Sequence, residues 1–177
     1  MTCIAAYVDN FTVHIAADSC ASDETSVETR VETKVWYADS GDWVMASMPS
    51  FRVMQILRYE MDPTKILGKP STCTIGNIVN KFIPELKLRV QSEPHPSLDF
   101  NILLGGMGKL WLIDADYAVN SVKDYVAIGS GAEYALGSIY TNIRVGASHP
   151  RNLVKEAVWA ACQFSNSCSP PVIYRGT

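Results

Sequence analysis

The segment Thr2–Ser19 reads TCIAAYVDNFTVHIAADS and contains two short apolar runs separated by a turn. Cys3–Val8 and Thr12–Asp18 are rich in β-branched, aromatic and small residues, and the pair Asp9-Asn10 between them favours a tight turn. We therefore predict an antiparallel hairpin that begins at the first residues of the chain and places them inside a sheet.

Beyond this hairpin, groups of strands alternate with pairs of helices. Ser19–Ser26 is polar and is expected to form a turn. The runs expected as strands are Val27–Thr29, Lys34–Ala38, Trp43–Ser47, Phe100–Leu104, Leu110–Asp114, Tyr125–Ile128 and Val172–Tyr174. The segments expected as helices, because their apolar residues recur at helical spacing, are Phe51–Met61, Thr74 to about Val90, Ala132–Ile143 and a segment that begins near Pro150.

This order of elements is neither the regular βαβ alternation of a doubly wound sheet nor an all-β sandwich, and it favours two packed sheets covered by helix pairs. Within the second helix, Pro84 should kink or divide the helix, and Ser71 or Thr72 is available as its cap. The first helix should end at Asp62-Pro63.

The composition indicates one soluble globular domain that spans residues 1–177, with 47% hydrophobic and 19% charged residues. No apolar run approaches the roughly 18 residues that cross a bilayer, so a membrane protein is not expected. The net charge of -3 and the scattered Lys and Arg residues give no basic patch for nucleic acid. An acidic residue, Asp9, stands where a secretory signal would need an uninterrupted apolar region, which predicts a cytoplasmic protein.

The five cysteines are an odd number, form no CxxC pair and do not stand at zinc-ligand spacing with the three histidines. We therefore expect reduced, mostly buried thiols and neither a metal nor a cofactor.

Thr2 is the first candidate for chemistry. An initiator methionine before threonine is commonly removed, and removal of Met1 would give Thr2 a free α-amine beside its own hydroxyl. A threonine hydroxyl is a weak nucleophile without a base, and an α-amine with a pKa of roughly 7.7–8.0 is a suitable base at neutral pH. The alternative interpretation is an ordinary first residue.

Three further residues could support such a nucleophile. Lys34 could favour the neutral amine and stabilise a developing alkoxide, or it could be a solvated surface residue. Asp18 could orient the lysine, or it could be a turn residue at a strand end. Ser130, in the small-residue turn Gly129-Ser130-Gly131-Ala132, could relay a proton to the amine, or it could cap a helix.

Thr2, the strand end Ala16-Ala17-Asp18-Ser19, Lys34 and the segment Gly129–Gly137 (GSGAEYALG) together resemble the proteasome β-subunit and HslV-type peptidases, which are N-terminal-nucleophile hydrolases. The resemblance covers nearly the whole chain. It implies an α+β fold, a four-layer αββα sandwich of two antiparallel sheets flanked by helix pairs. It also implies a threonine-type endopeptidase with the catalytic residues Thr2, Asp18, Lys34 and Ser130.

The resemblance also suggests where a substrate would bind. In this family the second strand after the catalytic lysine ends in a residue whose backbone N–H donates to the oxyanion hole. The corresponding segment of this chain is Val44–Pro49, which reads VMASMP. The amide of Ser47 or Met48 is therefore the expected donor. The expected pocket-lining residues are Ala21, Met45 and Ala46. The expected supporting residues are Gly129, Gly131, Asn166 and Ser169. The last two belong to the segment FSNSCS (164–169), and the family carries an aspartate and a serine at this place.

By the same resemblance the protein would hydrolyse peptides or unfolded protein inside a homo-oligomeric ring of stacked hexamers or heptamers, fed by an ATPase unfoldase. The apolar, Met-rich segment Phe51–Met61 would contribute to ring contacts or simply pack in the core. Two alternatives remain open: an inactive ring or scaffold protein with the same fold, and an amidohydrolase of the same superfamily that acts on a small amide. Cys3 and Cys20 rank lower as nucleophiles because neither has a histidine partner nearby in the sequence.

Overall fold

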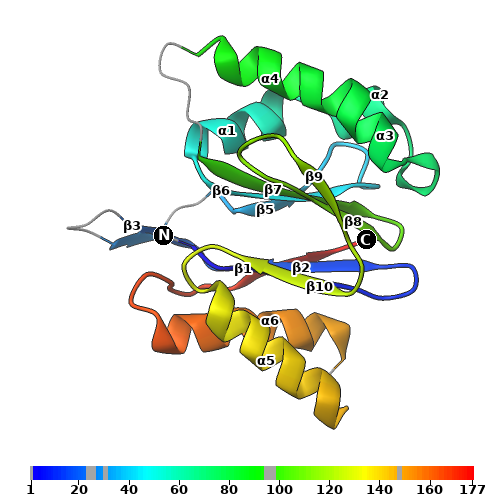
Figure 1. Cartoon of the computed structure of the whole chain (residues 1–177). Coiled ribbons are helices and arrows are strands. Elements are labelled where there is room, and N and C mark those ends of the chain that lie inside the picture. The colour runs from blue at the N-terminus through cyan, green and yellow to red at the C-terminus, as the bar shows by residue number, and fades with distance from the viewer. Residues whose placement is uncertain (1, 23–26, 30–31, 94–98, 147–148) are drawn as a thin grey trace.

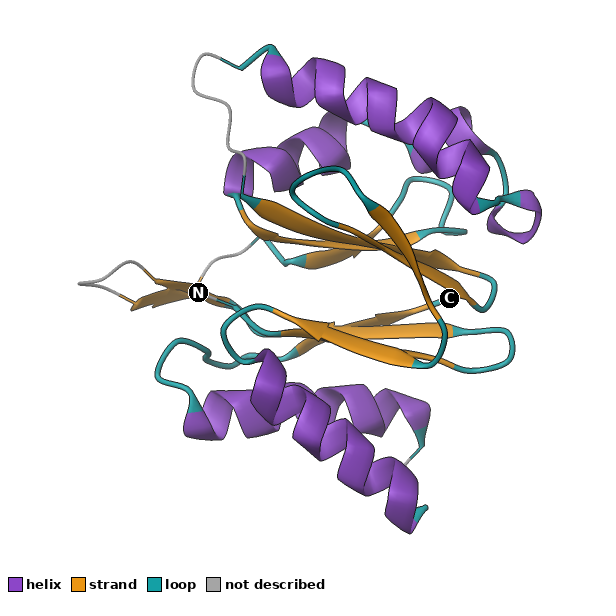
Figure 2. Ribbon diagram, in the orientation of Figure 1, coloured by secondary structure: helices purple, strands orange, loops and turns teal. Residues whose placement is uncertain are grey.

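A computed structural model describes residues 2–22, 27–29, 32–93, 99–146 and 149–177. Two antiparallel β-sheets face each other, and helices cover the outer face of each sheet (Figure 1; Figure 2). This arrangement confirms the α+β, four-layer αββα sandwich. None of the helices in the described ranges is long and apolar enough to cross a membrane.

The hairpin at the start of the chain is confirmed and forms the centre of a four-stranded sheet with the order β10-β1-β2-β11. The bounds of these strands are β1 Ile4–Val8, β2 Val13–Ala17, β10 Tyr125–Ile128 and β11 Ile173–Gly176. The Asp9 carboxylate accepts hydrogen bonds from the amides of Thr12 (2.8 Å) and Phe11 (3.2 Å), which stabilises the turn. Because β1 is an inner strand, the residue that precedes it is held inside the molecule.

The second sheet has five strands in sequence order, from β5 to β9. Their bounds are β5 Val35–Tyr37, β6 Val44–Pro49, β7 Phe100–Gly106, β8 Lys109–Ile113 and β9 Val119–Val122. The strand β9 was not expected from the sequence, since VNSV is short and half polar. It lies at the edge of the sheet, where polar side chains are tolerated.

A separate two-stranded ribbon consists of β3 (Cys20–Ser22) and β4 (Val27–Thr29). The turn expected over Ser19–Ser26 is therefore wrong for Cys20–Ser22, while residues 23–26 lie outside the described part of the chain. The register, in which Cys20 pairs with Thr29, shows that backbone pairing overrides the polar character of the sequence at this point.

The five-stranded sheet is covered by short helical segments (Figure 1). They are α1 Phe51–Gln55, the π-helical turn η1 Ile56–Glu60, α2 Pro63–Leu67, the 3₁₀ turn η2 Pro70–Thr72, α3 Ile75–Asn77, the π-helical turn η3 Ile78–Phe82 and α4 Ile83–Gln91. The helix α2 was missed because Asp62-Pro63 ends one helix and begins another. Asp62 caps α2 by accepting a hydrogen bond from the Thr64 amide (2.9 Å), and Pro63 occupies the first turn.

Pro84 was expected to kink or divide the second helix, but the chain is helical without a break from Ile75 to Gln91. A π-helical turn, Ile78–Phe82, directly precedes the turn that contains Pro84 and accommodates the missing N–H group of the proline. The expected cap at Ser71 or Thr72 is wrong. Thr74 caps the helix instead, in a capping box in which Thr74 and Asn77 each bond to the other's backbone.

The four-stranded sheet is covered by α5 (Ala132–Val145) and α6 (Pro150–Phe164), which pack against each other and against β1 and β2. The apolar side chains form three layers: one between α1–α4 and the five-stranded sheet, one between the two sheets, and one between the four-stranded sheet and α5–α6. Val53, Met54, Ile56, Leu57 and Met61 belong to the first layer. The apolar side of Phe51–Met61 therefore packs in the core. Core packing explains the apolar residues of this segment, so they are not evidence for contacts between the subunits of a ring.

We expect Leu103→Ala to lower the free energy of unfolding by about 2–5 kcal/mol, because Leu103 is fully buried between the sheets and its truncation leaves a cavity. The control, Leu88→Ala, removes a leucine that is 66% exposed on α4 and should change stability by about 0.5 kcal/mol or less. Chemical denaturation measures both variants. Equal losses would contradict the assignment of the intersheet layer as core.

Candidate active site

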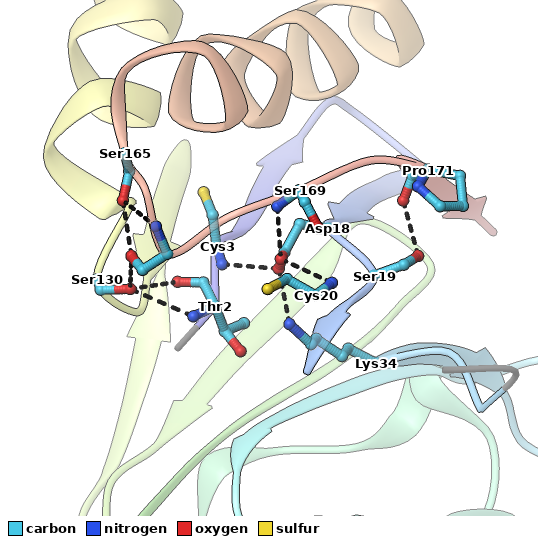
Figure 3. A network of polar contacts seen from close by, with 11 residues as sticks. Thr2, Cys3, Asp18, Ser19, Cys20, Lys34, Ser130, Ser165, Ser169 and Pro171 are labelled. Carbon is cyan, nitrogen blue, oxygen red and sulfur yellow. Dashed lines mark hydrogen bonds and ion pairs between the residues drawn. The ribbon is translucent and has the colours of Figure 1, made fainter. Parts of the chain in front are cut away.

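The Asp18 carboxylate directly follows β2 and is almost completely buried, with 1% of the residue exposed. Its Oδ1 accepts hydrogen bonds from the Cys3 amide (2.9 Å) and from the Lys34 ammonium group (2.8 Å). Its Oδ2 accepts hydrogen bonds from the amides of Cys20 (3.0 Å) and Ser169 (3.4 Å) (Figure 3). A buried carboxylate needs such donors because its removal from water is costly. Asp18 is thus a paired buried charge and not an exposed turn residue.

The Lys34 side chain is also buried, with 6% exposed, and immediately precedes β5. Its ion pair with Asp18 excludes the alternative of a solvated surface lysine. Thr2 and Lys34 line the same cleft, and in Figure 3 the Thr2 hydroxyl is turned toward the lysine ammonium group. The structure thus brings together three of the residues expected from the sequence.

The turn Gly129–Ser130–Gly131, which we call the elbow, connects β10 to α5 and contacts Thr2 (Figure 3). The Thr2 backbone nitrogen donates a hydrogen bond to Ser130 Oγ (3.2 Å), and the Gly131 amide donates one to the Thr2 carbonyl oxygen (3.3 Å). The N-cap of α5 is Gly131, and no side chain caps this helix. Ser130 is therefore not a helix cap, and its hydroxyl belongs to the site.

Both glycines of the elbow are required by close packing. Gly129 has φ +97°, and a Cβ atom on it would lie 2.1 Å from the Thr2 carbonyl oxygen. A Cβ atom on Gly131 would lie 2.8 Å from Cys168 Sγ and 2.9 Å from the Cβ of Cys3. Only glycine allows the elbow to approach the start of the chain this closely.

Behind the elbow, Ser130 Oγ lies 2.8 Å from Ser167 Oγ, and Ser167 Oγ lies 2.7 Å from Ser165 Oγ. Asn166 was expected in a supporting role, but its side chain is exposed. The neighbouring residue Ser167 is buried, and its hydroxyl reaches the elbow instead. Ser169, the other expected residue, contributes its amide to Asp18 and its carbonyl oxygen to the Ser19 amide (3.1 Å).

The cleft beside Thr2 is small. It is lined by Thr2, Lys34, Ser47 and Met48 together with Phe51 and Met54 of α1, and its free volume is about 10 Å³. A single buried water needs about 10–15 Å³. The free space directly beside Thr2 therefore holds about one water molecule at most.

The two expected oxyanion donors differ in availability. The Ser47 amide donates a hydrogen bond to the Lys34 carbonyl oxygen (3.2 Å) and is committed to the sheet. The Ser47 hydroxyl is buried and has no hydrogen-bond partner in the part of the chain that the structure describes. For Met48, whose sulfur lies against Gly129 at the edge of the cleft, the role stays a prediction.

The structure does not bring Met45 or Ala46 to the cleft. Met45 is fully buried in the layer beneath α1–α4, and Ala46 is fully buried between the two sheets. Successive side chains of β6 point to opposite faces, and both faces are covered, so neither residue lines an open pocket. Ala21 lies in β3 opposite Glu28, and its side chain is outside the described residues.

Three cysteines near the site, Cys3, Cys162 and Cys168, are not activated nucleophiles. Burial raises the pKa of Cys3 far above its usual range, and burial together with the nearby Asp18 raises the pKa of Cys162 to about 12. Burial also raises the pKa of Cys168. Within the described ranges, no group of His, Cys, Asp or Glu side chains is arranged to hold a metal ion.

Residues 165 and 167 are functional candidates that the sequence analysis did not single out. Their only signal in the sequence is a hydroxyl residue at every second position after the end of α6, in Ser165-Asn166-Ser167. Phe51 and Met54, which close the cleft, were expected only as apolar helix residues.

Comparisons with known proteins find structures with the same fold but no related sequence. No protein-family model and no curated protein sequence matches the chain. Solved structures match over nearly its whole length. Thiobacillus denitrificans BPH in complex with epoxomicin has a TM-score of 0.84 at 18% identity and covers 99% of this chain and 97% of its own. A second Thiobacillus denitrificans BPH structure has a TM-score of 0.82 at 20% identity and covers 100% of this chain and 97% of its own.

The eukaryotic HslV from Trypanosoma brucei matches with a TM-score of 0.71 at 17% identity, over 98% of each chain. At such low identities the matches show a shared fold. The fold that the sequence resemblance implied, that of HslV-type and proteasome-like proteins, is thereby confirmed.

We expect Lys34→Met to lower the free energy of unfolding by about 3–5 kcal/mol, because it leaves the Asp18 carboxylate buried without its counterion. The double variant Asp18→Asn/Lys34→Met should lose less than the sum of the two single variants, since neither charge is then left alone. The measurement is denaturant unfolding of all four proteins of the cycle.

A matched control is Lys65→Met, which breaks a lysine–aspartate pair (3.7 Å) whose lysine side chain is 82% exposed. This variant should change stability by about 0–1 kcal/mol. A loss for Lys34→Met as small as that for Lys65→Met would show that the buried pair does not hold the site together.

Proposed function

We propose that the protein is a proteasome- or HslV-like threonine peptidase in which Thr2, after removal of Met1, is the nucleophile. The observation that carries the proposal is the position of Thr2, whose backbone nitrogen contacts the Ser130 hydroxyl while its side chain shares a cleft with Lys34. The fold shared with HslV and BPH supports it.

In the proposed reaction, Thr2 Oγ attacks the carbonyl carbon of the scissile bond, and the Thr2 amine accepts the hydroxyl proton. The amine then passes this proton to the leaving amine, an acyl-enzyme remains on Thr2 Oγ, and water hydrolyses it. Lys34, held by Asp18, supplies positive charge that favours a neutral amine and stabilises the developing oxyanion. Ser130 positions the amine through its hydroxyl.

Removal of Met1 is a requirement of this mechanism. While Met1 is attached, the nitrogen of Thr2 belongs to an amide and has no useful basicity. Met1 lies outside the described residues, so its removal stays a proposal.

A second candidate is an amidohydrolase that acts on a small amide. Either substrate requires side chains such as Met48 and Phe51 to move, because the free volume of about 10 Å³ holds about one water molecule at most. The committed Ser47 amide is compatible with a third candidate, an inactive scaffold protein. Comparison of peptide and small-amide substrates on the same preparation distinguishes all three candidates.

The resemblance further leads us to propose a cytoplasmic, single-domain, homo-oligomeric ring with a peptide or unfolded-protein substrate and an ATPase unfoldase as partner. Exposed aromatic residues on the helices of the four-stranded sheet are compatible with assembly; they are Tyr134, Tyr140, Trp159 and Phe164. Contact between subunits would cover these side chains.

We expect protein that starts at Thr2 to hydrolyse peptides and protein that retains Met1 to be inactive, because only the former has a basic α-amine. Thr2→Ala should lower turnover by at least about 100-fold, whereas Thr2→Ser should keep activity because it keeps the hydroxyl. Intact mass identifies the first residue of each preparation, and a fluorogenic peptide series measures turnover. Full activity of Thr2→Ala, or of protein that retains Met1, would exclude the mechanism.

We expect Met48→Ala to widen the cleft and to raise the rate for peptides with a bulky residue on the acyl side of the scissile bond. The preference for bulky over small residues should change on the order of tenfold, the usual effect of a few methylene groups in a pocket. Met107→Ala is the control, since Met107 is 54% exposed in the turn between β7 and β8. An unchanged preference in Met48→Ala would show that this cleft does not bind the substrate.

A further inference from the structure

The side-chain hydroxyl of Ser47 is a buried polar group that the fold does not satisfy. Ser47 is 2% exposed, and its Oγ has no hydrogen-bond partner in the part of the chain that the structure describes. Nearly all buried hydroxyls in proteins are hydrogen-bonded, because burial without a partner destabilises the folded state. An unpaired hydroxyl in such a place therefore indicates a partner from outside the chain.

The register of the sheet explains why neighbouring strands offer no partner. Successive side chains of β6 point to opposite faces, so Ser47 lies on the same face as Met45, beneath α1. Its neighbour on β7 is Ile102, which is fully buried on that face. The neighbours of Ser47 along β6 and across to β7 are thus apolar on this face, and they cannot bond to its hydroxyl.

Ser47 lies beside the expected nucleophile. Ser47 and Thr2 line one cleft together with Phe51 and Met54 of α1, which follows β6 and covers the outer face of its sheet (Figure 1). In the proposed reaction, Thr2 Oγ attacks the carbonyl carbon of the residue on the acyl side of the scissile bond. The side chain of that residue, which we call the acyl-side chain, then enters the cleft between Ser47 and α1.

We propose that Ser47 Oγ forms a hydrogen bond with a hydroxyl group of the acyl-side chain, so that the protein prefers peptides with serine or threonine at this position. The inference rests on the proposed function, because the position of the substrate follows from Thr2 as the nucleophile. Ser47 is a specificity-determining residue in this account and takes no part in bond breaking.

The size and charge of the cleft favour a small, neutral side chain. The free volume is about 10 Å³, so serine and threonine displace Met48 and Phe51 less than longer polar side chains do. Lys34, which also lines the cleft, is paired with Asp18, so an acidic side chain would lose its hydration without gaining a counterion of its own. A hydroxyl group can donate a hydrogen bond to Ser47 Oγ or accept one from it.

The unpaired hydroxyl also predicts an effect on stability that does not depend on activity. Ser47→Ala removes a buried polar group without a partner, so the midpoint of denaturation should rise. The matched control is Ser50→Ala, which removes a hydroxyl at the same cleft that accepts a hydrogen bond from the Val53 amide (3.3 Å) at the start of α1; its midpoint should fall. A fall in Ser47→Ala as large as that in Ser50→Ala would overturn the inference, because the Ser47 hydroxyl would then be satisfied within the fold.

The main experiment uses full-length protein that starts at Thr2 and pairs of peptides that differ only in the acyl-side chain. One pair carries serine or alanine, and the other carries threonine or valine, which have nearly the same shape. We expect kcat/KM to be about tenfold higher for the hydroxyl peptide of each pair, the usual effect of one hydrogen bond to a buried neutral group. Ser47→Ala should abolish this preference, and Ser47→Thr, which keeps a hydroxyl, should retain that for serine over alanine. The control Ser121→Ala, which removes an exposed hydroxyl in β9, should retain both preferences.

The outcomes separate this inference from the proposed function. Hydrolysis without a preference for the hydroxyl peptides, or with the same preference in Ser47→Ala, would overturn the role of Ser47 and keep the peptidase. If no peptide is hydrolysed, isothermal titration calorimetry measures the binding of the same peptides instead. Tighter binding of the hydroxyl peptides that Ser47→Ala abolishes would then keep the role of Ser47 and exclude the peptidase. Equal or absent binding within each pair would overturn the inference as well.

Discussion

The buried Asp18 carboxylate is the constraint on which the rest of the site depends. A charge with 1% exposure must be met by donors, and the donors come from the start of β1, the start of β3, the turn after α6 and the residue before β5. Satisfying one carboxylate therefore fixes four segments relative to one another. Lys34 is held beside Thr2 because its ammonium group is the counterion of that charge.

The first strand makes the position of Thr2 precise. Because β1 is an inner strand of its sheet, the residue before it cannot fray, and the elbow packs against its carbonyl group. The absence of a Cβ atom at Gly129 and Gly131 permits this approach. The backbone nitrogen and hydroxyl of Thr2 and the ammonium group of Lys34 thus lie close together, held by the inner strand, the elbow and Asp18.

The sequence alone was sufficient for the elements whose patterns are strong. The opening hairpin and most of the strands and helices follow from apolar runs and turn residues. The grouping of Asp18, Lys34 and Ser130 around Thr2 was implied by the resemblance to proteasome β-subunits and HslV-type peptidases. The predictions that were wrong depend on tertiary contacts. The strands β3 and β9 were missed because they form through pairing with a neighbouring strand. Met45 and Ala46 do not line a pocket because both faces of β6 are covered. Ser167 was missed because only the folded turn shows which of the neighbouring residues 165–167 point inward.

The most direct test of the account is to trap the reactive residue with a peptide epoxyketone and to map the adduct by tandem mass spectrometry. A ketone carbon and an epoxide carbon in one compound can bond to a hydroxyl and an amine of the same residue, so the account predicts an adduct joined to both Oγ and N of Thr2. An adduct on any other residue, or none on protein that starts at Thr2, would contradict it.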